Sequence, residues 1–493
     1  MTSDNNRLSI GVIDDTASSL SDSIRERQEN ALNAIDLKLT ARQTLRERLK
    51  PEKSGISLRE LDEASAEIRQ KVERIARAVV SDMQRRGYAG QGAVIPDDKA
   101  LEMLRYLMDW QFGAGPLEFL FHEQDVEDIV INSSAVTPTQ SKVEVWTYRQ
   151  SGKRRESVEI SAEEVQEIIN RNASYQGRAL NTTAPIMNAQ MRNGSRINAI
   201  LNPVCDPQIS ATIRIHRLVA RSFDDLVRFG TLTPAAASWL WMCVQAGLAI
   251  VVAGGTSSGK TNFLNALARL MPSHLRVVCI EDTRELDLAV PDKVYMVTVQ
   301  RQPAETTDGS RNVTQRHLVA NALRMRPDRI VLGEVRDAAA WDAVKACNTG
   351  HQGTLLTVHA EDAESVVTRL MQLCGEAAET ANIPEKTLKD IVAAAFQQVV
   401  FLERRCQPDG SFQRTVTELV ELNGFVSDGV INQKSIFRLQ NGRLEWTKNW
   451  PHERVKRRLI DAGFTDKDIQ DALAGRREMW RGGAEEKGAG EKR

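Results

Sequence analysis

Apolar side chains recur every three or four residues between Ser57 and Gly87, which predicts an amphipathic helix of about eight turns. Ser57 and Glu60 form a capping box at its start. The apolar positions are Leu61, Ala64, Ile68, Val72, Ile75, Val79 and Met83. This face needs a partner surface, either inside its own subunit or on another protein. Residues 1–50 are charged with weak helical periodicity, so residues 1–97 are predicted to form a helical extension.

Short β patterns dominate residues 98–218. They are Val126–Asn132, Val143–Tyr148, Arg196–Leu201 and Ser210–His216. A capped helix from Ser161 to about Asn172 interrupts them. This part of the chain is expected to form a compact α+β domain, followed by a linker over residues 219–230.

Strands and helices alternate in residues 231–440, and that order predicts a mainly parallel sheet covered by helices. The expected strands are Ala249–Ala253, Val277–Ile280, Val294–Val299, Arg329–Leu332 and Gly353–His359. Residues 441–493 are expected to form a C-terminal extension. From about Arg476 the abundance of Gly, Glu, Lys and Arg predicts a disordered tail.

The stretch Ala235–Gly254 is apolar enough to resemble a membrane span. We interpret it as a buried helix followed by a buried strand, because Gly247 interrupts it and its second half runs into a glycine-rich loop. The polar, acidic start of the chain lacks the basic residues and apolar run of a signal peptide. We therefore expect a protein that is neither inserted into a membrane nor secreted.

Composition narrows the class of protein. The chain has 493 residues, of which 41% are hydrophobic and 27% charged, as in soluble globular proteins with two or three domains. A formal net charge of −1 provides no global field for nucleic acid or anionic lipid. The six cysteines stand singly without a Cys-x-x-Cys pair, which argues against a zinc site or a disulfide framework and favours a reducing compartment.

A glycine-rich loop follows the strand expected at Ala249–Ala253. Its residues are Gly254, Gly255, Thr256, Ser257, Ser258, Gly259, Lys260 and Thr261, and Asn262 opens the helical run that follows. The pattern Gly-x4-Gly-Lys-Thr between a strand and a helix predicts a phosphate-binding loop. Backbone N–H groups would hold the phosphates, Lys260 would reach the β- and γ-phosphates, and the Thr261 hydroxyl would bind Mg²⁺. ATP and Mg²⁺ are therefore the expected ligands.

An acidic turn follows the strand expected at Val277–Ile280. Its carboxylates include Glu281 and Glu285, which can orient Mg²⁺ through water or polarise the attacking water. A turn that is merely solvated is the alternative.

Glu334 lies at the end of the strand that begins at Arg329. At the carboxyl edge of the sheet, this carboxylate can hold and polarise a water opposite the γ-phosphate and can contact Mg²⁺ through water. Gly333 occupies the place where an Asp is usual. Magnesium binding must therefore depend on Thr261, water and the acidic turn.

His359 ends the strand expected at Gly353–His359. Beside the phosphates it could hydrogen-bond the γ-phosphate or relay its presence, with Thr357 helping to position it. A structural histidine is the alternative.

These four motifs, in this order, resemble the type II/type IV secretion ATPase superfamily. Matching motifs also lie upstream, at Gly115–Glu118, Val126–Asn132, Asn193–Asn198 and Thr212–Arg214, so the resemblance covers residues 98–405. The helical extension, the Gly-Glu-Val-Arg strand and the absence of a tetracysteine insert look most like the tight-adherence (Flp) pilus assembly ATPases of the CpaF/TadA type. Conjugation-type VirB11-like ATPases are close relatives.

The resemblance implies a PAS-like N-terminal domain and a RecA-like ATPase domain in a homohexamer, with nucleotide between the two domains. It implies that Arg196 and Arg214 reach the phosphates, with Arg192 and Arg217 behind them; for each, a surface or salt-bridging arginine is the alternative. It further implies polytopic inner-membrane platform proteins as partners and a cytoplasmic location peripheral to that membrane. No specific nucleic acid is expected.

The sequence departs from the family pattern in three places, at the pair Ser257–Ser258, at Asn262 and at Glu361. They suggest a divergent branch and weaken the choice of pilus over conjugation machinery, but they remove no group that hydrolysis needs. Two rival functions belong to other classes. One is a DNA-dependent RecA-like motor, and the other is a nucleotide-binding scaffold or switch with negligible turnover.

Overall fold

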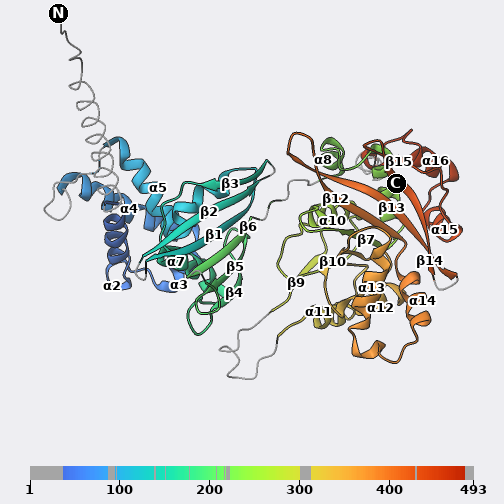
Figure 1. Ribbon diagram of the computed structural model, residues 1–493, viewed down its shortest axis with the longest axis horizontal. Coiled ribbons are helices and arrows are strands. Elements are labelled where there is room, and N and C mark those ends of the chain that lie inside the picture. The colour runs from blue at the N-terminus through green and yellow to red at the C-terminus, as the bar shows by residue number, and fades with distance from the viewer. Residues whose placement is uncertain are drawn as a thin grey trace, which may run out of the picture. The chain divides into compact units, whose positions relative to one another are not determined.

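The computed structural model describes residues 37–86, 95, 97–137, 140–149, 151–176, 178–206, 208–215, 217, 222–299, 312–427 and 430–482. The chain divides into two compact units. Unit 1 comprises the residues up to Tyr148 together with Arg154–Arg214, and unit 2 comprises Arg149–Lys153 and Ile215–Arg493. Figure 1 labels most of the elements of both units.

The first predicted helix is in fact two helices, so the prediction of one helix is wrong. α3 (Leu58–Glu63) ends at Ala64, whose φ of 49° is left-handed, and α4 (Ala66–Arg86) begins two residues later. The Ser65 hydroxyl accepts a hydrogen bond from the Ile68 N–H at 3.3 Å. A serine that caps a new helix competes with continuation of the old one, which explains the break.

The apolar face of α4 packs inside unit 1. Ser57 begins α3 with the predicted capping box, whereas Gly87 lies outside the described residues. The partners of α4 include helical residues 37–48 and α5 (Ala100–Phe112). The buried side chains of this cluster include Ala41, Leu45, Ile68, Val72, Ala76, Val79, Met83, Leu104 and Leu107. The partner surface of the helix is thus found in its own subunit. Short helices α2 (Pro51–Ser54) and η1 (Asp97–Lys99) complete this region.

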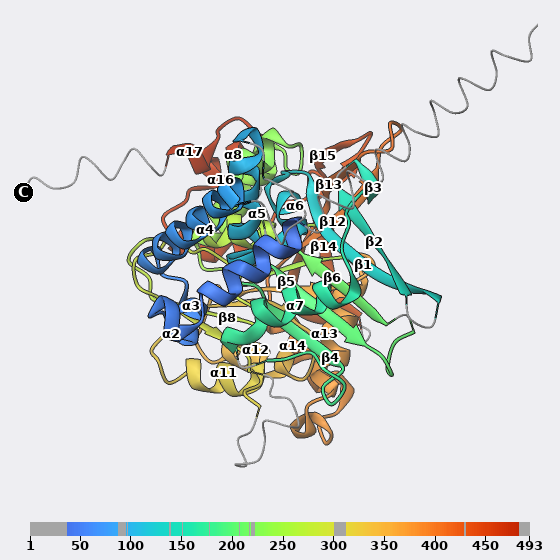
Figure 2. The same cartoon turned by 90° about the vertical axis from the view of Figure 1, so that its left-hand side faces the viewer.

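A six-stranded sheet forms the second part of unit 1, in the order β3-β2-β1-β6-β5-β4. The strands are β1 (Val126–Thr137), β2 (Gln140–Arg149), β3 (Gly152–Glu156), β4 (Ile186–Gln190), β5 (Arg196–Leu201) and β6 (Ile209–Arg214). The pairs β1–β6, β6–β5 and β5–β4 are antiparallel. Helices of unit 1 lie on one face of this sheet (Figure 1 and Figure 2). The remaining helices are η2 (Gly115–Leu117), α6 (Glu118–His122), α7 (Ala162–Ala173), with the predicted Ser161 cap, and η3 (Ser174–Gln176).

Unit 2 is built on a nine-stranded sheet in the order β15-β14-β13-β12-β7-β11-β10-β8-β9. The strands are β7 (Ile250–Gly254), β8 (Val277–Glu281), β9 (Lys293–Val297), β10 (Arg329–Val335), β11 (Leu355–His359), β12 (Gln398–Cys406), β13 (Phe412–Ser427), β14 (Val430–Gln440) and β15 (Arg443–Trp446). The five predicted strands are β7 to β11, and they are parallel as expected. β12 adds a further parallel strand, and β13 to β15 continue antiparallel.

Helices bury both faces of this sheet. Ile250 and Val252 belong to one core cluster, whereas Val251 and Ala253 belong to the other. Because side chains alternate along a strand, a continuous apolar run such as β7 requires cover on both sides. The helices are α8 (Phe223–Arg228), α9 (Pro234–Gln245), α10 (Lys260–Ala268), α11 (Gln315–Ala322), α12 (Ala339–Asn348), α13 (Ser365–Gly375), η5 (Ala378–Thr380), α14 (Glu385–Ala395), α15 (Glu453–Asp461), α16 (Asp466–Leu473) and α17 (Met479–Gly482). This is an α/β architecture, as predicted.

Two segments expected to lie outside this domain belong to its core. Phe223 of α8, in the predicted linker, is 1% exposed. Leu444 and Val455, in the predicted extension, are buried in the same cluster. Residues 476–482 are ordered, contrary to the predicted tail, since the Trp480 indole is buried and donates to Asp224 at 3.4 Å. The rest of that tail, residues 483–493, lies outside the described residues.

The stretch that resembles a membrane span, Ala235–Gly254, forms α9 and β7, as predicted. Within the described ranges, no helix combines the length and apolar character needed to cross a membrane.

Candidate nucleotide site

The glycine-rich loop joins β7 to α10. Its backbone turns through left-handed conformations at Ser257 (φ 59°) and Gly259 (φ 93°). A Cβ on Gly254 would lie 2.2 Å from the carbonyl oxygen of Leu402 on the neighbouring strand β12. Only glycine fits that position, so the loop can pass directly above the neighbouring strand.

Lys260 opens α10 and turns back across the loop. Its Nζ donates to the carbonyl oxygens of Gly254 and Gly255, at 2.9 Å and 2.8 Å. Ser258 Oγ and Asn262 Oδ1 are buried and have no hydrogen-bond partner among the described residues. A cradle of glycines, a cation at a helix N-terminus and an unpaired buried hydroxyl suit the phosphates of a nucleotide.

Glu281 fills the space that a side chain on residue 333 would need. It ends β8 and is 3% exposed, and a Cβ on Gly333 would lie 2.9 Å from its Cγ. Its carboxylate accepts hydrogen bonds from the N–H groups of Glu285 and Leu286, at 3.0 Å and 3.1 Å. The absence of the usual Asp on β10 therefore has a steric reason: the carboxylate at this place comes from the neighbouring strand.

Replacing Gly333 with Ala is expected to lower the free energy of unfolding by about 1–3 kcal/mol, because the added methyl group overpacks against the buried root of the Glu281 side chain. Urea denaturation measures the change. Gly375→Ala is the matched control, since a Cβ there meets nothing within 4 Å. Equal midpoints for the two variants would contradict the steric explanation.

Burial raises the pKa of Glu281 to about 7, against the opposing effect of its two backbone hydrogen bonds. Because the folded pKa lies above the unfolded value, folding stability from this group is present at low pH and is lost as the pH rises through 7. The free energy of unfolding of Glu281→Gln, relative to that of the wild type, should therefore rise by roughly 2–3 kcal/mol from pH 5 to pH 8. Urea unfolding of both proteins at each pH measures the gain, and a constant difference would show that Glu281 is ionised throughout.

Glu334 lies on β10 and forms an ion pair. The Arg336 guanidinium donates to its Oε2 at 2.5 Å, and the same guanidinium lies 3.8 Å from Asp282 Oδ2. The pKa of Arg336 is raised, chiefly by the bond to Glu334. Gln315 of α11 donates to the backbone carbonyl of Glu334 at 2.9 Å. The predicted catalytic residue is thus held at its carboxylate by Arg336 and at its backbone by Gln315.

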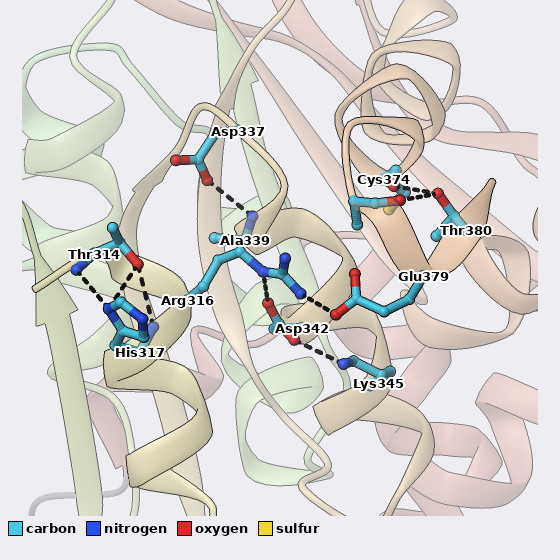
Figure 3. A network of polar contacts seen from close by, with 11 residues as sticks. Thr314, Arg316, His317, Asp337, Ala339, Asp342, Lys345, Cys374, Glu379 and Thr380 are labelled. Carbon is cyan, nitrogen blue, oxygen red and sulfur yellow. Dashed lines mark hydrogen bonds and ion pairs between the residues drawn. The ribbon is translucent and has the colours of Figure 1, made fainter.

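An ion-pair network anchors α11, the helix that carries Gln315 (Figure 3). Arg316 donates from Nε to Asp342 at 2.6 Å and from Nη2 to Glu379 at 2.7 Å. Lys345 pairs with the other oxygen of Asp342 at 2.7 Å. The hydrogen bond from Arg316 to Asp342, and after it the one to Glu379, raises the pKa of Arg316. The network joins α11, α12 and η5, and it fixes the helix that supports the Glu334 backbone.

Thr357 and His359 both lie on β11, but only His359 is exposed. Thr357 is buried and its hydroxyl donates to the Gly333 carbonyl at 2.6 Å, so it fastens β11 to β10. His359 is exposed and pairs in register with Gly254, the first residue of the loop. The carboxyl edge of the sheet therefore gathers the phosphate loop, Glu281, Glu334 and His359, all within unit 2.

The arginines that were predicted to reach the phosphates precede, in the sequence, the strands that form this edge. Arg196 and Arg214 are partners in register across β5 and β6 of unit 1, and Arg214 Nε bonds Asp128 at 2.9 Å. Arg192 pairs with Asp62 at 3.2 Å. Arg217 follows β6 in unit 2 and is half-buried. Their contribution to nucleotide binding stays a prediction.

Arg414 is a residue at the loop that no sequence motif marks. It lies on the unanticipated antiparallel strand β13, and its Nε donates to the Ser257 carbonyl at 3.0 Å. Its Cδ would lie 2.9 Å from a Cβ on Gly259. The arginine therefore contacts the phosphate loop at Ser257 and packs against Gly259.

Known proteins resemble this chain over most of its length. A family model described as Type II/IV secretion system protein matches residues 130–489. A Mycobacterium tuberculosis protein named for conjugal transfer is 32% identical over 356 residues, which cover 71% of this chain and 95% of the relative. The type IV secretion system protein PtlH of Bordetella pertussis is 31% identical over 305 residues, which cover 57% of this chain and 86% of PtlH. The crystal structure of the VirB11 ATPase from the Brucella suis type IV secretion system aligns at 25% identity and a TM-score of 0.33. The alignment covers 64% of this chain and 95% of the VirB11 chain.

Proposed function

Because this chain belongs to the type II/IV secretion system protein family, we propose that it is a hexameric ATPase motor that powers assembly of a type IV pilus of the tight-adherence (Flp) kind. ATP hydrolysis is the activity that the family implies. The observation that carries it is the meeting of the phosphate loop with Glu281 and Glu334 at one edge of the nine-stranded sheet.

The residues at this edge have separate roles in ATP hydrolysis. The loop and Lys260 bind the phosphates, and Thr261 and, through water, Glu281 and Glu334 would hold Mg²⁺, which supplies charge that offsets the phosphate oxygens. Glu334, once it leaves Arg336, accepts the proton of the attacking water. The water oxygen bonds to the γ-phosphorus, the bond to the bridging oxygen breaks, and the proton passes to the released phosphate.

The motor would work through closure of the N-terminal domain on the nucleotide, with arginines of that domain reaching the phosphates. Differential affinity of the open and closed states for ATP supplies the motion, and inner-membrane platform proteins would receive it on the cytoplasmic side. A conjugation-type, VirB11-like transfer ATPase is the second candidate. It is favoured by the names of two relatives, one for conjugal transfer and one for a type IV secretion system.

The test is the ATPase rate of the purified full chain with Mg²⁺ across protein concentrations, beside mass photometry. We expect turnover to rise as hexamers appear and to be absent in Lys260→Ala, which loses the contact to the phosphates. Monomers that hydrolyse ATP equally well would contradict the ring. Binding without turnover would favour a nucleotide switch, and stimulation by DNA with steep salt dependence would favour a nucleic-acid motor. Operon neighbours that encode pilins would distinguish pilus assembly from conjugation.

A further inference from the structure

Unit 2 contains a cavity at the end of its sheet opposite the nucleotide site. Its volume is about 310 Å³, and its lining includes Ala249, Gly350, Gln352, Gln397, Arg454 and Arg458. Ala249 immediately precedes β7, and the phosphate loop leaves the other end of that strand. A five-residue strand spans roughly 16 Å, so the two sites are separate.

Two arginines, Arg454 and Arg458, line this cavity, and a third, Arg329, bonds to its wall. Arg454 and Arg458 are four residues apart on α15, so they lie on the same face of the helix. Arg329, at the start of β10, donates to the carbonyl oxygen of the lining residue Gln352 at 2.6 Å. A Cβ on Gly353 would lie 1.5 Å from Arg329 Nη1, and one on Gly247 would lie 2.6 Å from it. Two glycines with positive φ therefore make room for this guanidinium.

The positive charge of this cluster is offset only in part, by the charge of Asp328 acting on Arg329. Among the described residues, no carboxylate lies within ion-pair distance of these three guanidinium groups, and the bonds described for them end on uncharged oxygens. Burial, and then the charge of Arg458, lowers the pKa of Arg329 to about 10. Burial, and then the charge of Arg454, lowers the pKa of Arg458. Like charges held together in a cavity favour a bound anion.

Helix capping explains only part of this arrangement. Arg454 donates to the Ala394 carbonyl near the end of α14 at 2.9 Å, and Arg458 donates to the Gly247 carbonyl at 3.3 Å. Arg458 Nη1 also donates to Gln397 Oε1 at 3.2 Å. A guanidinium carries five N–H donors in a rigid fork, so these contacts leave several donors for another acceptor. That fork matches the oxygens of a phosphate better than those of a single backbone carbonyl.

We propose that this cavity is a second anion site, which binds a small phosphate-bearing molecule through Arg454 and Arg458 with Arg329 behind them. The site is distinct from the phosphate loop and does not depend on ATP hydrolysis. Its ligand class is a free phosphate or diphosphate group.

The test measures pyrophosphate binding by calorimetry, without Mg²⁺, to the full chain carrying Lys260→Ala, so that the phosphate loop does not contribute. We expect pyrophosphate to bind this protein. Adding Arg454→Gln and Arg458→Gln together should raise the Kd at least tenfold. Arg457→Gln is the matched control, because Arg457 is exposed on the same helix and should leave the Kd unchanged.

Thermal unfolding with and without pyrophosphate separates binding from folding. If the double variant is less stable but keeps the full pyrophosphate-dependent shift, the arginines are helix caps only and the proposal fails. It also fails if the Lys260→Ala chain binds no pyrophosphate, or if Arg457→Gln weakens binding as much as the double variant. Binding of citrate in preference to pyrophosphate would overturn the phosphate class.

Discussion

Replacing Glu334 with Gln is expected to lower ATP turnover by about a hundredfold or more while ATP binding is kept. Glutamine has the shape of glutamate, but its amide cannot accept the proton of the attacking water. Glu334 lies on β10, outside the phosphate loop, and Arg336 is one of its side-chain partners. Steady-state phosphate release gives the turnover, and binding of a fluorescent ATP analogue gives the affinity.

A matched control separates this effect from a general loss of carboxylate charge. Glu376→Gln changes an exposed carboxylate just after α13, in the same unit, and should keep wild-type turnover. If Glu334→Gln hydrolyses ATP at more than about a third of the wild-type rate, a loss too small for a general base, another group activates the water. Glu281 would then be the next carboxylate to test.

Replacing Arg196 with Ala is expected to lower turnover by roughly a thousandfold, since a guanidinium brought to the transferring phosphoryl offsets its developing charge. ATP binding and hexamer formation should persist. Arg155→Ala, which removes an exposed arginine on β3 of the same unit, is the control and should be active. Full activity of Arg196→Ala would place this residue among ordinary surface arginines and leave Arg214 as the candidate.

Mixing two inactive variants shows which subunit supplies the arginine. A ring assembled from Arg196→Ala and Glu334→Gln subunits regains activity if Arg196 acts on a neighbour's nucleotide, because some sites then combine an intact Glu334 with an intact Arg196. If Arg196 acts within its own subunit, every site in the mixed ring lacks one of the two groups. Turnover against mixing ratio separates these arrangements.

Local rules account for the features that could be predicted from the sequence. The capping boxes at Ser57 and Ser161 depend on residues three positions apart, and both are present. The parallel strands β7 to β11 are short apolar runs, and the phosphate loop is a contiguous motif between β7 and α10. Because parallel strands share one carboxyl edge, the carboxylates Glu281 and Glu334 could be expected there.

The features that were missed depend on contacts between distant residues. Whether the helix continues past Ala64 depends on a competing cap at Ser65, which the apolar periodicity does not record. Gly333 is explained only by the side chain of Glu281, 52 positions earlier. Arg414 reaches Ser257 because β13 pairs with β12, and β12 pairs with β7, and no sequence motif encodes that order.

The position of β15 sets a limit on how the chain can be shortened. β15 pairs with the end of β14 along Phe437 to Gln440, and Leu444 is buried beneath α9 and its neighbours. A truncation after residue 440 would leave that stretch of β14 with unpaired backbone groups beside uncovered apolar side chains. Such an edge recruits strands from other molecules, so these fragments should form insoluble aggregates during expression, whereas removal of residues 483–493 leaves the edge covered.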